Sequence, residues 1–405
     1  MRPQGVIRGV LLASCAAGLL VSWISGNAAW QLFQLVVDVL VLAWFVGWVA
    51  GAFQKSNWPW LLIPFLAIIA LGTVQLYMGW TLYRFATRME ILRWGTFASV
   101  FFLGFQTVDE DAPQRRFCRL TAIYGFALAI VSLFQYFLGN GKIFWLFTPT
   151  ENASGFGPFL NYDHFASFIA LVLPAAAFEM RRGRHWFYVL ATAGLYAAAL
   201  ASTSRAGFAL VTLEVLILLV LLRFPGKVVG AITALVIVFA LVVGWESLYQ
   251  RYNVSDPYAG RREIAEASVR MIRATPWKGT GLGTWTDVYP AYAQRDLGAT
   301  INAAHNDWLQ WAGDGGIPLA CLVLVLFVGS ITYVRRAPWA LGVPIIFLHS
   351  LIDFPLQGRF LPAAVFLMLG VAARASGSRR ERKAGPRPPK AATMRAVTPA
   401  LDPQG

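Results

Sequence analysis

The chain has 405 residues, of which 57% are hydrophobic and 13% are charged, and its mean hydropathy is +0.57. A soluble globular domain is about half apolar and about a quarter charged. Apolar runs long enough to cross a membrane also recur from end to end. The composition therefore excludes a soluble enzyme, a disordered protein and a secreted disulfide scaffold, and it predicts an all-helical polytopic membrane protein.

The formal net charge is +14. In a membrane protein, Lys and Arg fix the topology, so this charge does not imply nucleic acid as a partner. Cys15, Cys118 and Cys321 lie far apart, which leaves no disulfide framework and no zinc-binding pair.

Twelve transmembrane helices are expected, the first as an uncleaved anchor. Their ranges are Gly9–Ser25, Leu32–Phe53, Trp58–Tyr77, Leu92–Val108, Phe117–Leu138, Phe165–Met180, Trp186–Ala201, Ala206–Leu222, Val228–Gly244, Ile317–Val334, Trp339–Leu351 and Phe360–Ala373. This division gives helices one to nine within residues 1–244, a loop over 245–307, helices ten to twelve within 308–373, and a tail over 374–405.

The basic residues indicate which way these helices cross. In the short connections, 13 Lys and Arg fall on one side and 6 on the other. Because the positive side faces the cytoplasm, both termini are expected there and the long loop is expected outside. The tail is rich in Pro, Lys and Arg, which predicts disorder; it either rests on anionic lipid or only fixes the orientation.

The unusual polar residues lie in the outward connections. Arg84, Arg88 and Arg205 adjoin apolar helix ends, where a cation is costly unless it reaches water or an anion. An Arg fork suits phosphate, so these residues favour a shared anionic ligand, although snorkelling remains an alternative for Arg88 and Arg93. Asn161, Tyr162, Asp163 and His164 lie in a second outward connection, and His349, Asp353 and Arg359 lie in the last one; the fourth histidine, His185, is cytoplasmic.

The long loop is expected to be partly helical. Residues 260–274 have an apolar face flanked by arginines, including Arg261 and Arg262, which is typical of an amphipathic helix that either lies on the membrane or has a solvated charged face. The segment GTGLGTW (279–285) is neither a Walker loop nor a Rossmann fingerprint, and on its own it indicates a turn. His305 opens the helix before the tenth span, with Asp307 two residues on. Its imidazole could serve as a general base, although an isolated interfacial histidine is more often structural.

Four stretches together resemble the O-antigen ligase and O-antigen polymerase superfamily of bacterial membrane glycosyltransferases. They are GPFLNYDHFASFIALVLP (157–174), STSRAGF (202–208), WKGTGLGTW with AHNDWLQWAGDGGIP (within 277–318) and HSLIDFPL (349–356). Each motif is loose, but their order and common sidedness are specific. Asp314 departs from the pattern, because a Glu is expected there.

The resemblance implies a GT-C-like helical bundle in the bacterial inner membrane that needs neither a cofactor nor a metal. Its donor would be a glycan on undecaprenyl diphosphate, and its acceptor lipid A–core or another glycan, at the periplasmic face among the membrane lipids. Arg205 would bind the diphosphate and His305 would serve the acceptor hydroxyl, with inversion at C1. The expected substrate-binding residues are Arg84, Arg88, Asn161, Tyr162, His164, Arg261, Arg262, Asp307 and Asp353.

Other functions remain open. Ligase and polymerase need the same donor site and are not separated by these residues. Asp38 and Glu214 lie deep within expected spans, which would suit a transporter, although paired halves are not evident. A non-catalytic partner in polysaccharide export is a third reading.

Overall fold

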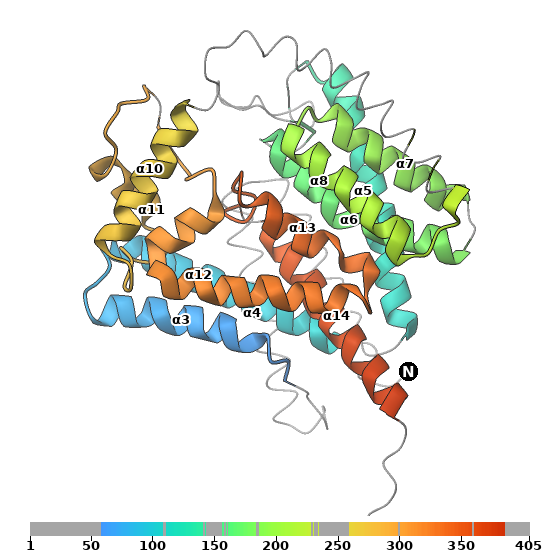
Figure 1. Cartoon of the computed structure of the whole chain (residues 1–405), viewed down its shortest axis with the longest axis horizontal. Helices are drawn as coiled ribbons and strands as arrows, with labels where there is room; N and C mark the ends of the chain where they lie inside the picture. Colours follow the sequence, from blue (N-terminus) through green and yellow to red (C-terminus); the bar gives the residue numbers. More distant parts are fainter. Residues whose placement is uncertain are drawn as a thin grey trace, which may run out of the picture.

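The computed structural model describes residues 58–107, 111–140, 142, 156–157, 159, 161–183, 186–227, 230, 234, 259–298, 300–358 and 360–384. Within these ranges the chain is helical, and the one strand-like pairing is an isolated bridge between Phe156 and Phe159 (Figure 1). The expected spans Gly9–Ser25 and Leu32–Phe53 lie outside the described residues, as does nearly all of Val228–Gly244.

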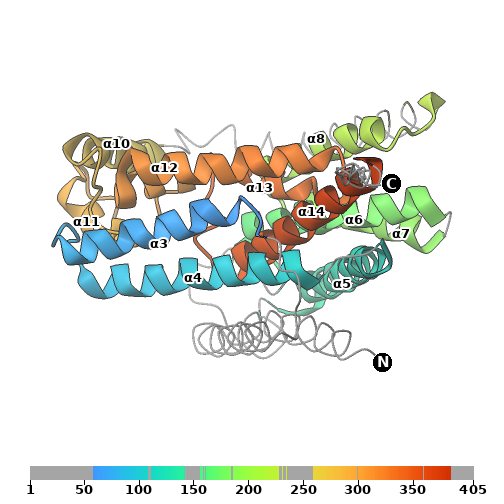
Figure 2. The same ribbon diagram turned by 90° about the horizontal axis from the view of Figure 1, so that it is seen from below.

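Two groups of helices pack against each other. One contains α3 (Leu62–Tyr77), α4 (Arg84–Thr107), α12 (Asp307–Val334) and α14 (Phe360–Ala384). The other is built around α6 (Tyr162–Gly183), which contacts α5 (Asp111–Leu138), α7 (Trp186–Ala201), α8 (Arg205–Leu221) and α13 (Gly342–His349). The short helix η2 (Pro338–Ala340), together with α13 of the second group, lies where the two groups meet (Figures 1 and 2).

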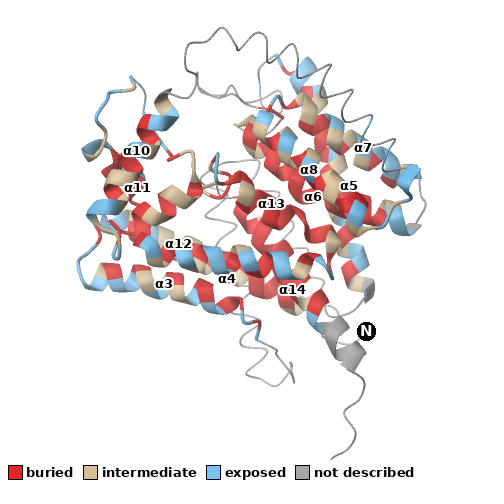
Figure 3. Ribbon diagram, in the orientation of Figure 1, coloured by how far each residue is buried: buried red, intermediate tan, exposed pale blue. Residues whose placement is uncertain are grey.

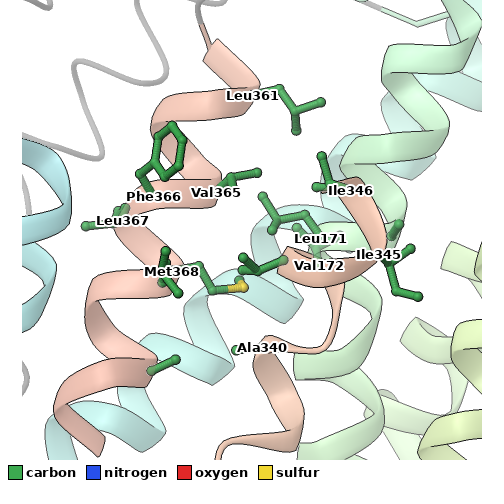
Figure 4. Packing of buried hydrophobic residues seen from close by; sticks show 14 of the residues in the cluster. Leu171, Val172, Ala340, Ile345, Ile346, Leu361, Val365, Phe366, Leu367 and Met368 are labelled. Carbon is green, nitrogen blue, oxygen red and sulfur yellow. The ribbon is translucent and has the colours of Figure 1, made fainter. Parts of the chain in front are cut away.

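Apolar side chains fill the contact between the groups. Leu171 and Val172 of α6 face Ile346 of α13 and Val365 of α14 (Figure 4). An aromatic cluster joins α3, α4 and α14, with Phe65 and Phe366 ring centroids 5.0 Å apart and Phe97 and Phe366 centroids 5.2 Å apart. Figure 3 shows the resulting continuous buried band through α6, α13 and α14.

Four described helices are long and apolar enough to cross a membrane: Pro113–Leu138, Tyr162–Arg182, Asp307–Val334 and Phe360–Gly377. Leu62–Tyr77, Trp186–Ala201 and Pro338–His349 are shorter apolar helices. The chain is therefore all-helical with several candidate spans in the described part, and the number twelve is not confirmed.

Several helix boundaries differ from the expected ones. α4 begins at Arg84, two helical turns before the apolar run that starts at Leu92. The residues of these two turns include charged side chains but are still helical. α14 continues to Ala384, into the tail that was expected to be disordered, because RASGSRRERKA is rich in residues with good helix propensity. Residues 385–405 lie outside the described part.

The expected helix in the long loop is present as α10 (Ala259–Ala274). Its apolar residues Ile264, Ala267 and Met271 are buried, but they pack against α11 (Trp285–Val288) and η1 (Tyr289–Ala291). The apolar face is therefore covered by protein, which favours the alternative in which α10 only exposes a charged face to solvent.

Candidate active site

Three histidines that are far apart in sequence gather around one buried carboxylate. Asp353 follows α13, and its two oxygens lie 3.8 Å from His164 Nε2 and 3.8 Å from His305 Nδ1. Asp353 is 2% exposed, whereas the two imidazoles are 19% and 29% exposed. The carboxylate is thus buried beneath two imidazole rings that are partly exposed to solvent.

The third histidine, His349, is the last residue of α13. Its Nδ1 lies 2.6 Å from the Ser167 hydroxyl, which also lies 3.0 Å from the Asp163 carbonyl oxygen. A hydroxyl has a single proton, so donation to that carbonyl leaves Ser167 to accept from the His349 Nδ1–H. His349 is 1% exposed, so it supports the cluster from behind.

Phe354 separates the two exposed imidazoles. Its ring meets the His164 ring edge-on at 4.9 Å and the His305 ring edge-on at 4.8 Å. Edge-to-face contacts at such distances restrict ring rotation. Phe354 therefore fixes the planes in which both histidines present their nitrogens.

Backbone contacts hold the segment after α13 against the start of α12. The Asp307 amide donates to Ser350 O at 2.9 Å, the Asn306 side chain donates to Leu351 O at 2.7 Å, and Asp307 Oδ2 accepts from Leu356 N at 3.0 Å. Asp307 is fully buried. Its position indicates that it orients the Asp353 segment, so the structure gives no support to its expected contact with substrate.

His305 has a strained backbone. Its φ is +50°, a left-handed conformation that non-glycine residues adopt rarely. The next residue, Asn306, caps α12 by accepting from Leu309 N at 3.0 Å, and Ala304 N donates to Gln310 at 3.0 Å. Contacts on both sides thus impose the conformation that directs the His305 ring toward Asp353.

Arg205 begins α8 at the edge of the same cluster. Ser204, the N-cap of α8, accepts from Gly207 N at 3.0 Å and donates to Asp163 Oδ1 at 2.5 Å. Asp163 is within electrostatic range of Asp353 and His305. Arg205 and His305 therefore lie on segments joined through Asp163, and the Arg205 side chain is exposed.

Arg261 of α10 reaches the cluster from the long loop. Its guanidinium donates to Ile352 O at 3.2 Å, next to Asp353. Burial alone would raise the pKa of Asp353, but the nearby imidazoles of His305, His164 and His349 hold that pKa below its usual value. This lowered pKa favours the carboxylate form of Asp353 beside the imidazoles.

The remaining predicted residues are placed as follows. Asn161 accepts from Asp163 N at 2.8 Å and so starts α6, and Tyr162 packs against the core. Arg262 is exposed on α10. Arg84 and Arg88 are exposed on α4, and the interactions seen among the described residues do not join them to the histidine cluster. Arg93 is bound to Glu90 at 2.6 Å and to Gln357 O at 2.7 Å.

The glycine-rich segment is a buried structural turn, as the sequence indicated. Gly281 N donates to Asp314 O at 3.0 Å and Trp285 N donates to Asp314 Oδ1 at 2.7 Å. Gln75 of α3 donates to Lys278 O at 2.7 Å and accepts from Leu282 N at 2.9 Å. The backbone amides of the glycine-rich segment thus donate hydrogen bonds within the protein. Asp314, where a Glu was expected, accepts two of them.

Several residues of the cluster were not among the predicted site residues: Asp163, Ser167, Ser204, His349 and Phe354. Asp163 and His349 are polar residues in outward connections, a signal that was present in the sequence. Ser167 lies within the apolar helix α6 and Phe354 in the segment after α13, and neither carries a signal of its own. In the described part, no three His, Cys, Asp or Glu side chains are grouped as metal ligands.

Of the two deep acids, the structure describes only Glu214. Glu214 is buried in α8, and neither of its carboxyl oxygens has a hydrogen-bond partner among the described residues. Asp38 and His185 lie outside the described residues.

Residues 187–324 match the family described as O-antigen ligase. The matched segment contains both Arg205 and His305 and ends within α12. A search of curated proteins finds no match. The resemblance inferred from the four motifs is thereby confirmed over this segment, while Asp163, His164, His349 and Asp353 come from parts of the chain outside it.

Proposed function

We propose that this chain transfers a glycan from undecaprenyl diphosphate to an acceptor hydroxyl, because residues 187–324 match the O-antigen ligase family, whose members are glycosyltransferase-like enzymes of ligase or polymerase type. The acceptor is lipid A–core or a similar glycan, and the reaction takes place at the periplasmic face of the bacterial inner membrane. The observation that carries the proposal is the meeting of His305, Asp353 and the Arg205 segment in one cluster.

His305 is the general base of the proposed reaction. The acceptor oxygen attacks C1 of the first sugar while its proton passes to an imidazole nitrogen of His305. The charge that develops on the imidazole is stabilised by Asp353, 3.8 Å from Nδ1. Because Nδ1 faces Asp353, Nε2 is the nitrogen that receives the proton.

Arg205 and Arg261 stabilise the leaving group. The bond between C1 and the phosphate oxygen breaks as the acceptor bond forms, so negative charge grows on the lipid diphosphate. A guanidinium donates two parallel hydrogen bonds to phosphate oxygens, which suits both bridging and terminal positions. Arg205 is exposed at the start of α8 and Arg261 reaches Ile352, so both lie at the rim of the cluster.

The proposed reaction inverts the configuration at C1. A retaining double displacement needs a nucleophilic side chain, such as a carboxylate, that attacks C1, whereas a single displacement needs only a base for the acceptor. Asp353 is 2% exposed and lies behind two imidazoles, so it is badly placed to attack a sugar. Asp163 is buried and already accepts from Ser204 at 2.5 Å.

Arg205→Ala and His305→Ala test the proposal separately. The purified chain in nanodiscs is supplied with a fluorescent oligosaccharide on undecaprenyl diphosphate and with lipid A–core, and transfer is followed by thin-layer chromatography. We expect each variant to lose transfer by roughly 10²-fold or more, with the binding of lipid A–core unchanged. Arg295→Ala, which removes an exposed arginine elsewhere in the loop, is the matched control. Full activity in either test variant would remove that residue from the reaction.

The same assay separates the two activities of the family. Glycan on lipid A–core identifies a ligase, and a longer lipid-linked chain made without that acceptor identifies a polymerase. Substrate flux across a sealed vesicle that survives loss of both Arg205 and His305 would instead favour transport, the role to which the buried Glu214 would belong.

A further inference from the structure

The connection between α3 and α4 exposes an unusual set of apolar side chains. We define the α3–α4 turn as residues 77–89. Tyr77 is 86% exposed and Leu82 is 68% exposed. The other large exposed side chains of the turn are Met78, Trp80, Tyr83, Phe85 and Met89. Figure 3 shows this end of α3 and α4 as largely exposed.

The two threonines of the same turn point inward. The hydroxyls of Thr81 and Thr87 are 2.6 Å apart, and both residues are buried. Trp80 N donates to Gln75 O at 2.9 Å, and Leu82 N donates to Thr280 O at 2.9 Å. The turn is therefore fixed to α3 and to the glycine-rich segment, with its hydroxyls inside and its large apolar side chains outside, the reverse of a water-facing loop.

α3, the helix that leads into the turn, is short compared with the thickness of a bilayer. α3 has 16 residues and so spans about 24 Å, less than the roughly 30 Å hydrocarbon core of a bilayer. Its exposed side chains, including Ile63, Leu66 and Val74, form an apolar surface that continues into the turn. The exposed Tyr77, Trp80 and Tyr83 at the end of this short helix suit the level of the headgroups, where Tyr and Trp are favoured.

The charge of the turn is uniformly positive. Arg84 and Arg88 are four residues apart on α4, so they project from the same side of the helix, and both are exposed. The turn contains no Asp or Glu, and the next acid, Glu90, is bound to Arg93 at 2.6 Å. Two arginines beside exposed aromatic rings complement an anionic interface.

We propose that the α3–α4 turn is seated in the headgroup layer of the membrane, with Leu82 and Phe85 among the acyl chains and Arg84 and Arg88 bound to the phosphates of anionic phospholipids. This surface is separate from the histidine cluster, and it replaces the donor-binding role that the sequence suggested for these two arginines. It anchors the end of α3 beside the glycine-rich segment, through which it steadies the start of α12.

The depth of the turn is tested with nitroxide labels. Leu82→Cys and Phe85→Cys are labelled in a background in which the three native cysteines are replaced by Ala and thermal unfolding is unchanged, and the proteins are placed in phosphatidylglycerol nanodiscs. We expect both labels to be relaxed more by oxygen than by a water-soluble nickel chelate. A label at the exposed Thr286 should show the opposite preference. Labels at Leu82 and Phe85 that are as accessible to the chelate as the Thr286 label would overturn the proposal.

The phosphate contact is tested by lipid-dependent stability. For the whole chain, replacing phosphatidylcholine by phosphatidylglycerol in the nanodiscs should raise the Tm. We expect Arg84→Ala with Arg88→Ala to reduce this rise by about half or more, and Arg295→Ala to leave it in place. An undiminished rise in the double variant, with or without a higher KM for the lipid-linked donor, would contradict the proposal. Neither readout involves glycan transfer, so failure of the proposed activity would not change them.

Discussion

Asp353 lies between two imidazoles and has no backbone donor close to its oxygens among the described residues. Replacing it by Asn keeps its size but removes the charge that would stabilise a protonated His305. We expect Asp353→Asn to lower the rate of glycan transfer by roughly 10²- to 10⁴-fold with little change in donor KM, measured in the nanodisc assay. Asp287→Asn, at an exposed position of α11, is the control. A KM effect alone would assign Asp353 to substrate binding.

The same pair of proteins gives a pH test of stability. The pKa of Asp353 is lower in the folded protein than its usual value, so the folded state favours the carboxylate. Its contribution to the free energy of unfolding is complete above the ordinary carboxyl pKa of about 4 and declines as pH falls through the lower, folded value. We expect the Tm difference between the wild type and Asp353→Asn to be constant from neutral pH to about pH 5 and to shrink below pH 4. A difference that grows on acidification would show that the carboxyl is protonated in the native protein.

The residues could be predicted to different degrees. Arg205 and His305 stand in recognisable motifs, and charge beside an apolar helix end marks Arg205 even without a family. The hydrogen bond from Ser204 to Asp163 connects residues 41 positions apart, and no local pattern encodes it. Arg84 and Arg88 carry the same local signal as Arg205, but no interaction seen among the described residues joins them to the cluster, so charge alone could not assign them.

The glycine-rich segment is the element that joins α3, α4 and α12. Gly281 has φ of +118°, and a Cβ on it would overlap the Thr81 hydroxyl. We expect Gly281→Ala to lower the free energy of unfolding by about 2 kcal/mol or more, because backbone strain and overlap add. Gly79→Ala, at φ +67° with open space around its Cα, should cost only about 1 kcal/mol. Thermal unfolding in nanodiscs measures both, and equal losses would contradict the packing argument.

Helices were predicted well where an apolar run defined them. The range Trp186–Ala201 agrees with α7, and the loop helix expected over 260–274 agrees with α10. The residues of α10 do not indicate which part of the chain covers its apolar face. Trp285 and Tyr289 reach that face only through the fold of the loop. In α12, Gly316 has non-helical angles, so Asp307–Gly315 and Ile317–Val334 are two helices, and the expected span began at the second.

For the whole molecule, the proposed chemistry assigns the diphosphate charge to arginines. We therefore expect glycan transfer to persist after dialysis against EDTA, because the guanidiniums remain in place when divalent cations are removed. The measurement is the initial rate of transfer before and after EDTA, with Mg²⁺ added back as the control. If transfer is lost and Mg²⁺ restores it, a divalent cation stabilises the diphosphate charge together with Arg205 and Arg261.

The broken helix α12 has a consequence for how acceptors are chosen. Its first segment is tied at one end by Ile317 N, which donates to Pro276 O at 2.8 Å, and at the other by Asn306, which donates to Leu351 O at 2.7 Å. Because both ends of this segment are held by hydrogen bonds, His305 is attached to a rigid segment and not to a mobile loop. In the proposed reaction, discrimination between acceptors would then depend on the side chains along the path of the acceptor, so a change of specificity would require other residues at the rim of the cluster and would leave this segment unchanged.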